Sequence, residues 1–475
     1  MGMKNLKKVV WGVCCTLFSS GLMAQTPPVL TLSLEKALEI ALSENPTIRV
    51  ADKEIERKDY SRKEAIGALL PVIEASGQYS RTLQKQVMYM DMDVDTETGS
   101  DSESGDQEGD AGGLGGIDMS KGMKVGRDNN WNGGFSMSLP IIAPALWKNI
   151  QLTQIDIEQT LESARASRIS LVNQVEKAYY NILNAEDSYN VLLMSYDNAK
   201  LNAQNYSDKF KQGLVSEYDV LRSEVQVRNL EPGLLQAENG VRLAKLQLAV
   251  LLGLDVNIGI ETETKLADYE ESLYRDALDL DTSLQHNTDL KQMEIQERLL
   301  EKTLQVQQMS YYPTLSATAN YTWMSMNDDF KFSQYRWTPY SSVGIALSIP
   351  LFQGGTRYFK EQQAKIGIEQ LKYQRDDLER NLRMQVQAAQ DNIAQSVKQV
   401  SSNKEGVRQA EKAYEIMQKS FEIGSATFVE LNDADLALTN SRLAYNQAIY
   451  DYLTAKAELN MILGKNVVEI DNNKQ

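Results

Sequence analysis

The densest group of potential metal ligands in this sequence is an acidic segment between residues 88 and 126. Its acids at every second position, Asp91, Asp93 and Asp95, resemble the first ligands of a calcium-binding loop. However, Thr96 and Ser102 stand where such a loop has its glycine and its glutamate. Methionines at its start also alternate, and thioether sulfur suits soft ions such as Cu(I). The alternatives are that the acids form a solvated loop and that the methionines pack against the protein or contact lipid. We expect these alternatives to hold, and therefore no bound metal. The candidate ligands are Asp91, Asp93, Asp95, Met88, Met90 and Met92.

Groups that catalyse reactions are scarce in the rest of the sequence. His286 is the only histidine and has no cysteine or acidic cluster beside it, and both cysteines, Cys14 and Cys15, lie in the first 24 residues. No nucleophile elbow or phosphate-binding loop is present. The sequence therefore predicts neither an enzyme nor a cofactor.

Two related stretches carry ionisable side chains close to a glycine. Residues 210–222 contain Gly213 and residues 421–433 contain Gly424, each followed by a hydroxyl residue three positions on and an acid six positions on. Glycine commonly ends a helix, and serine or threonine commonly begins one. Each stretch is therefore expected to form the tip of a helical hairpin.

The two tips belong to a sequence that is duplicated. Pro71 and Pro313 begin similar segments 242 residues apart, and Asn45 and Asn287 have the same separation. The glycine pairs 213/424 and 253/464, later in each copy, are only 211 residues apart. Because the separation falls along the chain, the first copy must contain an insertion that the second lacks. We expect a first repeat over residues 25–254, a second over 255–464 and a C-terminal tail over 465–475.

Four segments alternate apolar residues with small or polar ones, which is the pattern of strands. They span residues 71–88 and 130–140 in the first repeat and 313–325 and 338–350 in the second. One apolar face and aromatic residues near the strand ends suit the wall of a membrane β-barrel. The acidic loop, residues 89–127, then faces the cell exterior. The alternative is a half-buried sheet of a soluble domain.

Long helical patterns follow the strands in each repeat. The predicted hairpins span residues 143–253 and 354–463, and their apolar residues recur in heptad steps that are typical of left-handed coiled coils. Pro232 and Gly233 should kink or break the returning helix of the first hairpin. The predicted fold class is therefore mainly α with a β-barrel contribution.

The charge and the first residues of the chain indicate export without nucleic-acid binding. The formal net charge of −16 opposes contact with phosphate backbones. Residues 1–24 combine a basic start, a short apolar run and small residues, as a cleaved signal peptide does. No later apolar run reaches about 18 residues, so any membrane contact would have to use the strands.

The order of strand hairpin, long coiled helix and glycine-marked tip, present twice behind a signal peptide, resembles the TolC-like outer membrane efflux protein family. The resemblance implies a homotrimer with a twelve-stranded barrel in the outer membrane of a Gram-negative bacterium and a helical barrel in the periplasm. Physical reasoning also requires several copies, because four strands cannot close and eight leave almost no lumen.

In function, the resemblance implies a passive exit duct for small toxic compounds, driven by an inner membrane transporter through a periplasmic adaptor protein. One alternative keeps this architecture but exports polypeptides in a type I secretion system. Another, of a different class, is a soluble exported coiled-coil scaffold.

The resemblance also assigns roles to the tips. Counting from the shared glycines places the acids of the family's gate at Asp219, Glu430 and Asp433, and Arg222 is a substitute for an arginine that is missing at Ala426. Alternatively, these acids are solvated side chains that favour the positive end of a helix dipole. The implied adaptor contacts are Gly213, Leu214, Val215, Ser216, Gly424, Ser425, Ala426 and Thr427.

Overall fold

A computed structural model describes residues 29–88, 123–255, 257–271, 273 and 282–465 of the chain. The predicted signal peptide, the tail after Lys465 and most of the acidic loop lie outside these ranges, and so do Asp91, Asp93, Asp95, Met90 and Met92. The chain divides into two compact units, each built from both sequence repeats. We call Asp52–Ser163 with Asp289–Glu379 the strand unit, and the remaining described residues the tip unit.

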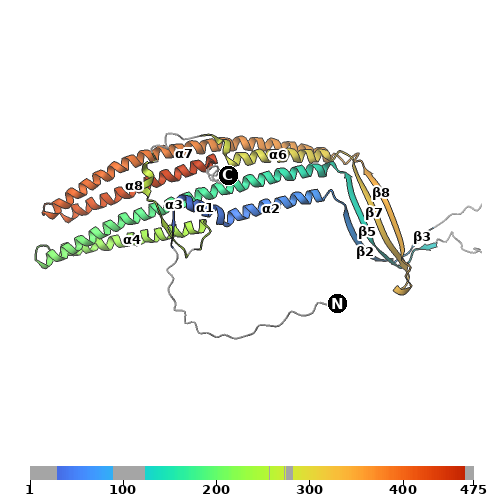
Figure 1. Ribbon diagram of the computed structural model, residues 1–475, viewed down its shortest axis with the longest axis horizontal. Helices are drawn as coiled ribbons and strands as arrows, with labels where there is room; N and C mark the ends of the chain where they lie inside the picture. Colours follow the sequence, from blue (N-terminus) through green and yellow to red (C-terminus); the bar gives the residue numbers. More distant parts are fainter. Residues whose placement is uncertain (1–28, 89–122, 256, 272, 274–281, 466–475) are drawn as a thin grey trace, which may run out of the picture. The chain divides into compact units, whose positions relative to one another are not determined.

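Four antiparallel strands form the sheet of the strand unit, in the order β2-β5-β7-β8 (Figure 1). Their bounds are β2 (Val72–Arg81), β5 (Asn129–Ile142), β7 (Thr314–Asn327) and β8 (Thr338–Ser348). β5 of the first repeat pairs directly with β7 of the second, with Phe135 opposite Tyr321. β2 and β8 are therefore the edge strands, and each has one side without a strand partner in the described chain.

The register of the sheet separates an apolar face from a polar one. Ala319 lies opposite Val343, Ala317 opposite Ile345 and Leu315 opposite Leu347, whereas the intervening positions are mostly serine, threonine and asparagine. Val343 is 86% exposed and Ile345 is 73% exposed. We call this side of the sheet the apolar face, and a single copy of the chain leaves it open.

The first predicted strand, residues 71–88, is divided in the structure. β2 ends at Arg81, and a separate β3 (Gln86–Met88) pairs with β4 (Met123–Val125). β4 lies inside the segment predicted as an acidic loop, so a short two-stranded ladder forms the base of that loop.

Helices of the strand unit come from both repeats. They are α2 (Pro46–Gly67), α6 (Thr288–Met309) and the first parts of α3 (Pro144–Lys211) and α7 (Thr356–Glu422). Ion pairs join α2 to α3 through Lys58 and Asp156, at 2.7 Å, and α6 to α3 through Arg298 and Glu158, at 2.8 Å. Such partly exposed pairs contribute only about 0–1 kcal/mol each, but they identify the neighbouring helices.

The tip unit contains the rest of α3 and α7 with the returning helices α4 (Glu217–Leu251) and α8 (Phe428–Leu463). It also holds β1 (Val29–Leu32), α1 (Leu34–Glu44) and β6 (Gly259–Thr262), with β1 and β6 paired in parallel. The fully buried Tyr179 of α3 donates its hydroxyl to the Leu32 carbonyl at 3.1 Å, which fixes the end of β1 to the helices.

The sequence duplication is visible as a repeated contact in the tip unit. Asn45 Nδ2 donates to the Leu251 carbonyl at 2.7 Å, and Asn287 Nδ2 donates to the Ile462 carbonyl at 2.7 Å. Gly253 and Gly464, which follow these helices, have a positive φ of 71°. The matched asparagines and glycines therefore close each returning helix in the same way.

Pro232 does not break the returning helix of the first hairpin, so a break there is wrong, and a kink, the other outcome expected from Pro232 and Gly233, stays a prediction. α4 continues through it from Glu217 to Leu251. Most helical stability in proteins comes from tertiary packing, and α4 has buried residues on both sides of the proline, such as Ser223 and Leu248.

Candidate functional site at the helical hairpin tips

The first tip is a glycine-terminated helix followed by a tight turn. Gly213 has a φ of 74°, its N–H donates to the Phe210 carbonyl at 2.8 Å, and the Leu214 N–H donates to the Lys209 carbonyl at 3.0 Å. This pattern is a Schellman motif. It requires one residue in the left-handed backbone conformation, which glycine adopts without strain. Gly213 is therefore a structural requirement of the turn.

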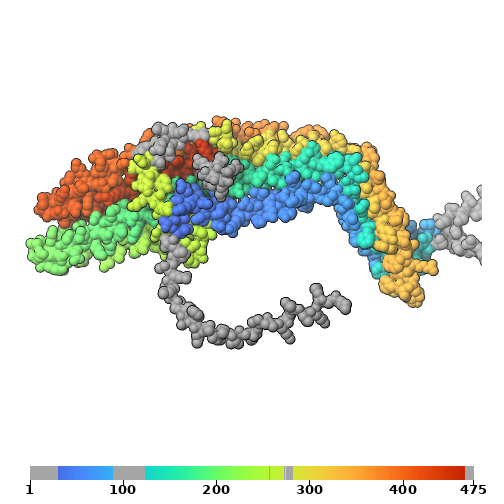
Figure 2. Space-filling model, in the orientation of Figure 1, coloured from blue at the N-terminus to red at the C-terminus, as the bar shows by residue number. Residues whose placement is uncertain are grey.

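The second tip has the same backbone geometry. Gly424 has a φ of 77°, its N–H donates to the Phe421 carbonyl at 3.1 Å, and the Ser425 N–H donates to the Ser420 carbonyl at 2.9 Å. The two tips lie at the same end of the tip unit, green for α3 and α4 and orange to red for α7 and α8 (Figures 1 and 2).

Two of the predicted gate acids complete capping boxes. The Asp219 N–H donates to Ser216 Oγ at 3.2 Å, and the Ser216 hydroxyl donates to Asp219 Oδ2 at 2.7 Å. In the second tip, the Thr427 N–H and hydroxyl donate to Glu430 Oε2 at 2.7 and 2.8 Å. These carboxylates therefore start the returning helices, whatever else they do.

Electrostatics at the tips follow from these hydrogen bonds. The backbone N–H of Thr427, and then its hydroxyl, hold the pKa of Glu430 below its usual value. Burial raises the pKa of Tyr206, the Asp219 carboxylate raises it further, and Arg222 opposes the shift. Tyr206 of α3 therefore lies close to two of the residues predicted to form the gate.

The four predicted gate residues do not form a cluster within one chain. Arg222, Glu430 and Asp433 are exposed and Asp219 is half-buried. Among the described residues no ion pair joins Arg222 to an acid of the second tip. A pairing of Arg222 with an acid of the other tip stays a prediction.

Aromatic side chains that are not among the predicted gate residues join the two hairpins instead. The Tyr206 ring lies 5.9 Å from that of Phe421 and 5.3 Å from that of Phe428, between ring centroids. Lys209 Nζ lies 5.4 Å from the Phe421 ring, within cation–π range. We call Tyr206, Phe421 and Phe428 the aromatic clasp. The apolar heptad steps of α3 pass through Tyr189, Leu193 and Tyr196, and continuing them by three, four and three residues reaches Tyr206, so the signal was present in the sequence.

A cavity of about 530 Å³ lies between α3 and α7 beside the clasp. Its lining combines side-chain amides and charges with the rings of Tyr206 and Phe421. Further from the tips, Asp435 of α8 accepts from the Ser195 hydroxyl at 2.6 Å and from Asn198 Nδ2 at 3.2 Å. The hairpins are thus joined by polar contacts behind the aromatic ones.

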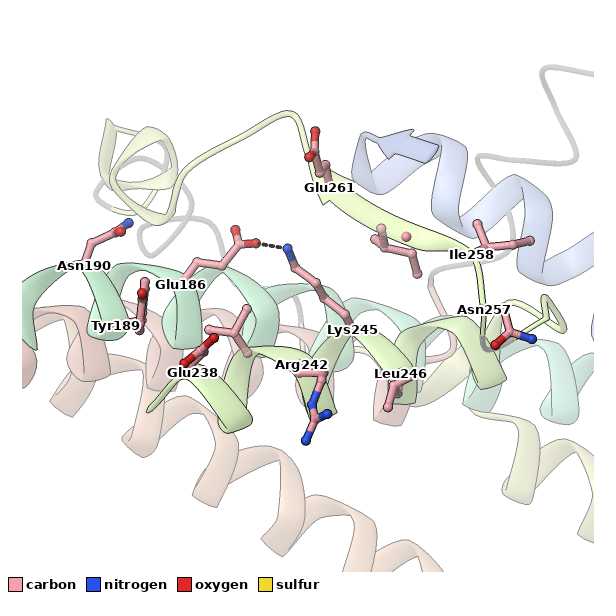
Figure 3. A pocket seen from close by; sticks show the side chains of 13 residues that line it. Glu186, Tyr189, Asn190, Glu238, Arg242, Lys245, Leu246, Asn257, Ile258 and Glu261 are labelled. Atoms are coloured by element: carbon pink, nitrogen blue, oxygen red, sulfur yellow. Dashed lines mark ion pairs between the residues drawn. The ribbon is translucent and has the colours of Figure 1, made fainter. Parts of the chain in front are cut away.

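A second hollow, of about 770 Å³, lies where β6 crosses α3 and α4 (Figure 3). In it Lys245 Nζ of α4 is 2.7 Å from Glu186 Oε1 of α3, and Glu186 Oε2 accepts from the Thr262 hydroxyl at 2.9 Å. These side chains fasten β6 to two helices.

Metal ligands are not assembled in the part of the chain that the structure describes, where no three acids, histidines or cysteines lie together. Of the candidate methionines only Met88 is described, and it is 41% exposed in β3. None of the described helices combines the length and the apolar character that crossing a membrane requires.

Comparison with known proteins identifies the class of this chain. The outer membrane efflux protein family model matches residues 37–254 and 280–465, and the chain belongs to that family. The resemblance drawn from the repeats is thereby confirmed, and so is the outer membrane location.

Individual relatives are distant in sequence. Outer membrane protein TolC of Escherichia coli is 24% identical over 374 residues, which cover 72% of this chain and 74% of that protein. Alkaline protease secretion protein AprF of Pseudomonas aeruginosa is 24% identical over 314 residues, which cover 64% and 63%. The structure of the Campylobacter jejuni outer membrane channel CmeC matches with a TM-score of 0.68 at 17% identity, over 93% of this chain and 88% of that one.

Proposed function

We propose that three copies of this chain form the outer membrane channel of a tripartite efflux system. In this proposal the channel is a passive exit duct for small toxic compounds, and its helices extend into the periplasm. A periplasmic adaptor protein connects it to an inner membrane transporter, which supplies the energy. Membership of the outer membrane efflux protein family supports this function.

The observation that carries the oligomeric part of the proposal is the open sheet. β2 and β8 each have an edge without a strand partner in the described chain, and unpaired edges are not tolerated in lipid. Joining β8 of one copy to β2 of the next closes the sheet, and three copies give twelve strands with room for a lumen. The exposed Val343 and Ile345 then face lipid, and this favours a membrane channel over a soluble scaffold.

The tips supply the gate and the adaptor surface in this proposal. Asp219, Arg222, Glu430 and Asp433 line the narrow end, where three copies of each acid attract cations and resist closure unless they are paired. Adaptor contact uses the turn residues Gly213, Leu214, Val215, Ser216, Gly424, Ser425, Ala426 and Thr427. The duplicated design assigns residues 25–254 and 255–464 as the two repeats, preceded by a signal peptide over 1–24.

A type I polypeptide secretion duct is the second candidate. The name of AprF, alkaline protease secretion protein, describes secretion of a protease, and AprF is as similar to this chain in sequence as TolC is. The architecture required is the same, so the identity of the inner membrane partner separates the two.

Single-channel conductance of the purified full chain in a planar bilayer tests the duct. We expect low conductance that rises when Asp219, Glu430 and Asp433 are replaced by alanine together. A bilayer that stays silent with both proteins would count decisively against a gated duct. Solubility without detergent would instead support the scaffold.

A further inference from the structure

The two outer helices of the tip unit are α7 and α4, which lie at its opposite edges with α8 and α3 between them (Figure 1). Side-chain contacts join α7 to α8, α8 to α3 and α3 to α4 in that order. The joining pairs are Glu411 with Arg442, Asp435 with Ser195, and Glu186 with Lys245. Each outer helix therefore has a neighbour on one side and a free side on the other.

Apolar side chains are uncovered on both outer helices. On α4, Tyr218 is 68% exposed, Leu221 54% and Val225 56%, and steps of three and four residues place them on one face. On α7, Ile416 is 56% and Ile423 is 81% exposed, seven residues apart. Apolar rows with this spacing pack against another helix in coiled coils. Both rows therefore suit contact with a further helix.

Charged side chains accompany these rows at intervals of seven residues or multiples of seven. The acids on α4 are Glu217, Glu224, Glu231 and Glu238, and the bases on α7 are Lys398, Lys412 and Lys419. All are exposed except Glu231, which is half-buried, and Glu231 is the only one of them with an ion pair among the residues that the structure describes. Because residues seven apart share one face of a coiled helix, each set forms a line. We call these lines the acidic stripe of α4 and the basic stripe of α7.

The two stripes match in height above the hairpin tips, which lie at one end of the unit. Glu217 is 4 residues from Gly213, and Lys419 is 5 residues from Gly424. The next matched pairs are Glu224 with Lys412, at 11 and 12 residues from these glycines, and Glu238 with Lys398, at 25 and 26. A difference of one residue is only about 1.5 Å along a helix. Since rotation about an axis parallel to the helices leaves height unchanged, an acid of one copy and a base of the next copy come level.

The match extends to the next heptad, where both stripes change sign. Seven residues beyond Glu238 the stripe of α4 has Lys245, and seven residues before Lys398 the stripe of α7 has Asp391. Asp391 is exposed, whereas Lys245 also pairs with Glu186 of its own copy at 2.7 Å. The inverted pair therefore keeps the charges of the two helices complementary at a fourth level.

One level of the two stripes places acid opposite acid. Glu405 takes the place between Lys398 and Lys412, and it is level with Glu231 of α4. Both acids are already paired on their own helices, Glu405 with Arg408 at 2.9 Å and Glu231 with Arg228 at 3.3 Å. This level is therefore close to neutral and does not oppose the contact.

We propose that the acidic stripe of α4 pairs with the basic stripe of α7 in a second copy of this chain, level by level, and so sets which copies join and in what register. The two surfaces differ, so the contact is heterologous and closes in a ring. Charges beside an apolar seam govern partner choice and orientation in coiled coils. A helix of another protein can cover either stripe alone, but the complementarity of two stripes on one chain favours a second copy. The inference rests on the proposed assembly of three copies and adds the side chains that fix its register.

Cysteine cross-linking of the purified full-length protein measures the register. Both native cysteines lie in the predicted signal peptide, so introduced thiols report without interference. Glu224→Cys combined with Lys412→Cys should be joined by a short bismaleimide into dimers and trimers on a denaturing gel. Glu224→Cys combined with Lys398→Cys should not, because these positions differ in height by about 20 Å. Equal yields from the two pairs, or products confined to single chains, would overturn the proposal.

Charge reversal measures the strength of the contact. Lys398→Glu with Lys412→Glu turns two attractions at each contact into repulsions, and each contact should weaken about 5- to 30-fold. The protein concentration at half-assembly, followed in detergent by native mass spectrometry, should rise by at least that factor, because the contacts of a ring form together. Adding Glu224→Lys and Glu238→Lys to the same chain restores opposite signs and should return assembly close to the parent. A reversed protein that this second pair does not rescue would refute the stripes.

A matched variant and a salt series control for net charge. Lys200→Glu with Lys291→Glu makes the same charge change at exposed positions outside both stripes, and this protein should assemble as the parent does. Salt screens exposed charges, so it should weaken assembly of the parent and strengthen that of the reversed variant. A control that assembles as poorly as the reversed variant would assign the effect to net charge and overturn the proposal.

Conductance separates this inference from the proposed function. A parent that assembles and conducts, but whose reversed variant is not rescued, would refute the stripes alone. A parent that stays monomeric and silent in the bilayer would refute the duct and the stripes together.

Discussion

Replacing Tyr206 with leucine should release the aromatic clasp and favour the open channel. Tyr206 is the ring that the other two share, since it touches Phe421 of α7 and Phe428 of α8 from its position on α3. Separation of the two hairpins must break both contacts. Leucine keeps much of the apolar volume and removes the ring, so the change reports on the aromatic contacts more than on general packing.

The magnitude follows from the two ring pairs. Centroid distances of 5.9 and 5.3 Å lie in the range where an aromatic pair contributes about 0.5–1.5 kcal/mol beyond its buried area. Losing both therefore shifts the closed-to-open equilibrium by about 1–3 kcal/mol, which is roughly 5- to 150-fold in population. The cation–π contact of Lys209 with Phe421 does not involve Tyr206 and should persist.

Open probability in single-channel recordings measures the effect. Tyr206→Leu should raise it by a factor in the stated range, and Tyr206→Phe, which keeps the ring, should stay close to the parent. Tyr196→Leu is the matched control, because Tyr196 lies on the same helix and makes no ring contact among the described residues. The circular dichroism spectrum must show that each variant is folded.

A second substitution shows whether the rings act together. If Tyr206 and Phe428 are coupled, the double variant with Phe428→Leu should fall short of the sum of the single effects by about 0.5–1.5 kcal/mol. An open probability of folded Tyr206→Leu within twofold of the parent would refute the clasp. Strict additivity of the two changes would refute their contact.

Two further predictions concern the tip unit. Gly464→Ala should lower the unfolding temperature far more than Gly424→Ala. Both glycines have a positive φ, which costs an alanine about 1–2 kcal/mol of backbone strain at either position. At Gly464 the new Cβ would in addition lie 2.1 Å from the backbone oxygen of His286, whereas at Gly424 it would meet nothing within 4 Å. Equal melting shifts in differential scanning calorimetry would contradict this. For Glu270, burial raises the pKa, but hydrogen bonds from Lys404 and Tyr445, at 2.6 and 2.7 Å, outweigh it and hold the pKa below its usual value. Its contribution to stability is therefore present above about pH 4.5 and lost as the pH falls through the lowered pKa, so Glu270→Gln should destabilise at pH 7 and flatten the acid limb of the melting temperature against pH. An unchanged acid limb would show that other carboxylates govern it.

Much of the architecture was predictable because it depends on local patterns that recur. Gly213 and Gly424 end helices by a backbone conformation that other residues rarely adopt, and the capping residues after them restart the chain as helix. Recurring separations, of 242 residues between matched prolines and asparagines and of 211 residues between matched glycines, revealed the duplication. The family assignment followed from their order, which a single sequence contains in full.

Other features depend on which elements meet, and a local pattern carries no such information. Pro232 has a sequence signal for a break, yet buried residues on both sides keep α4 continuous. The pairing of β5 with β7, the meeting of Tyr206 with Phe421 and Phe428, and the position of Phe330 over Tyr79 all join residues far apart in the chain. The sequence by itself determined the repeats, the turns and the alternating strands, because these follow from the conformational preferences of neighbouring residues. Only the tertiary structure decided which rings and charges lie together, because that depends on the packing of distant segments.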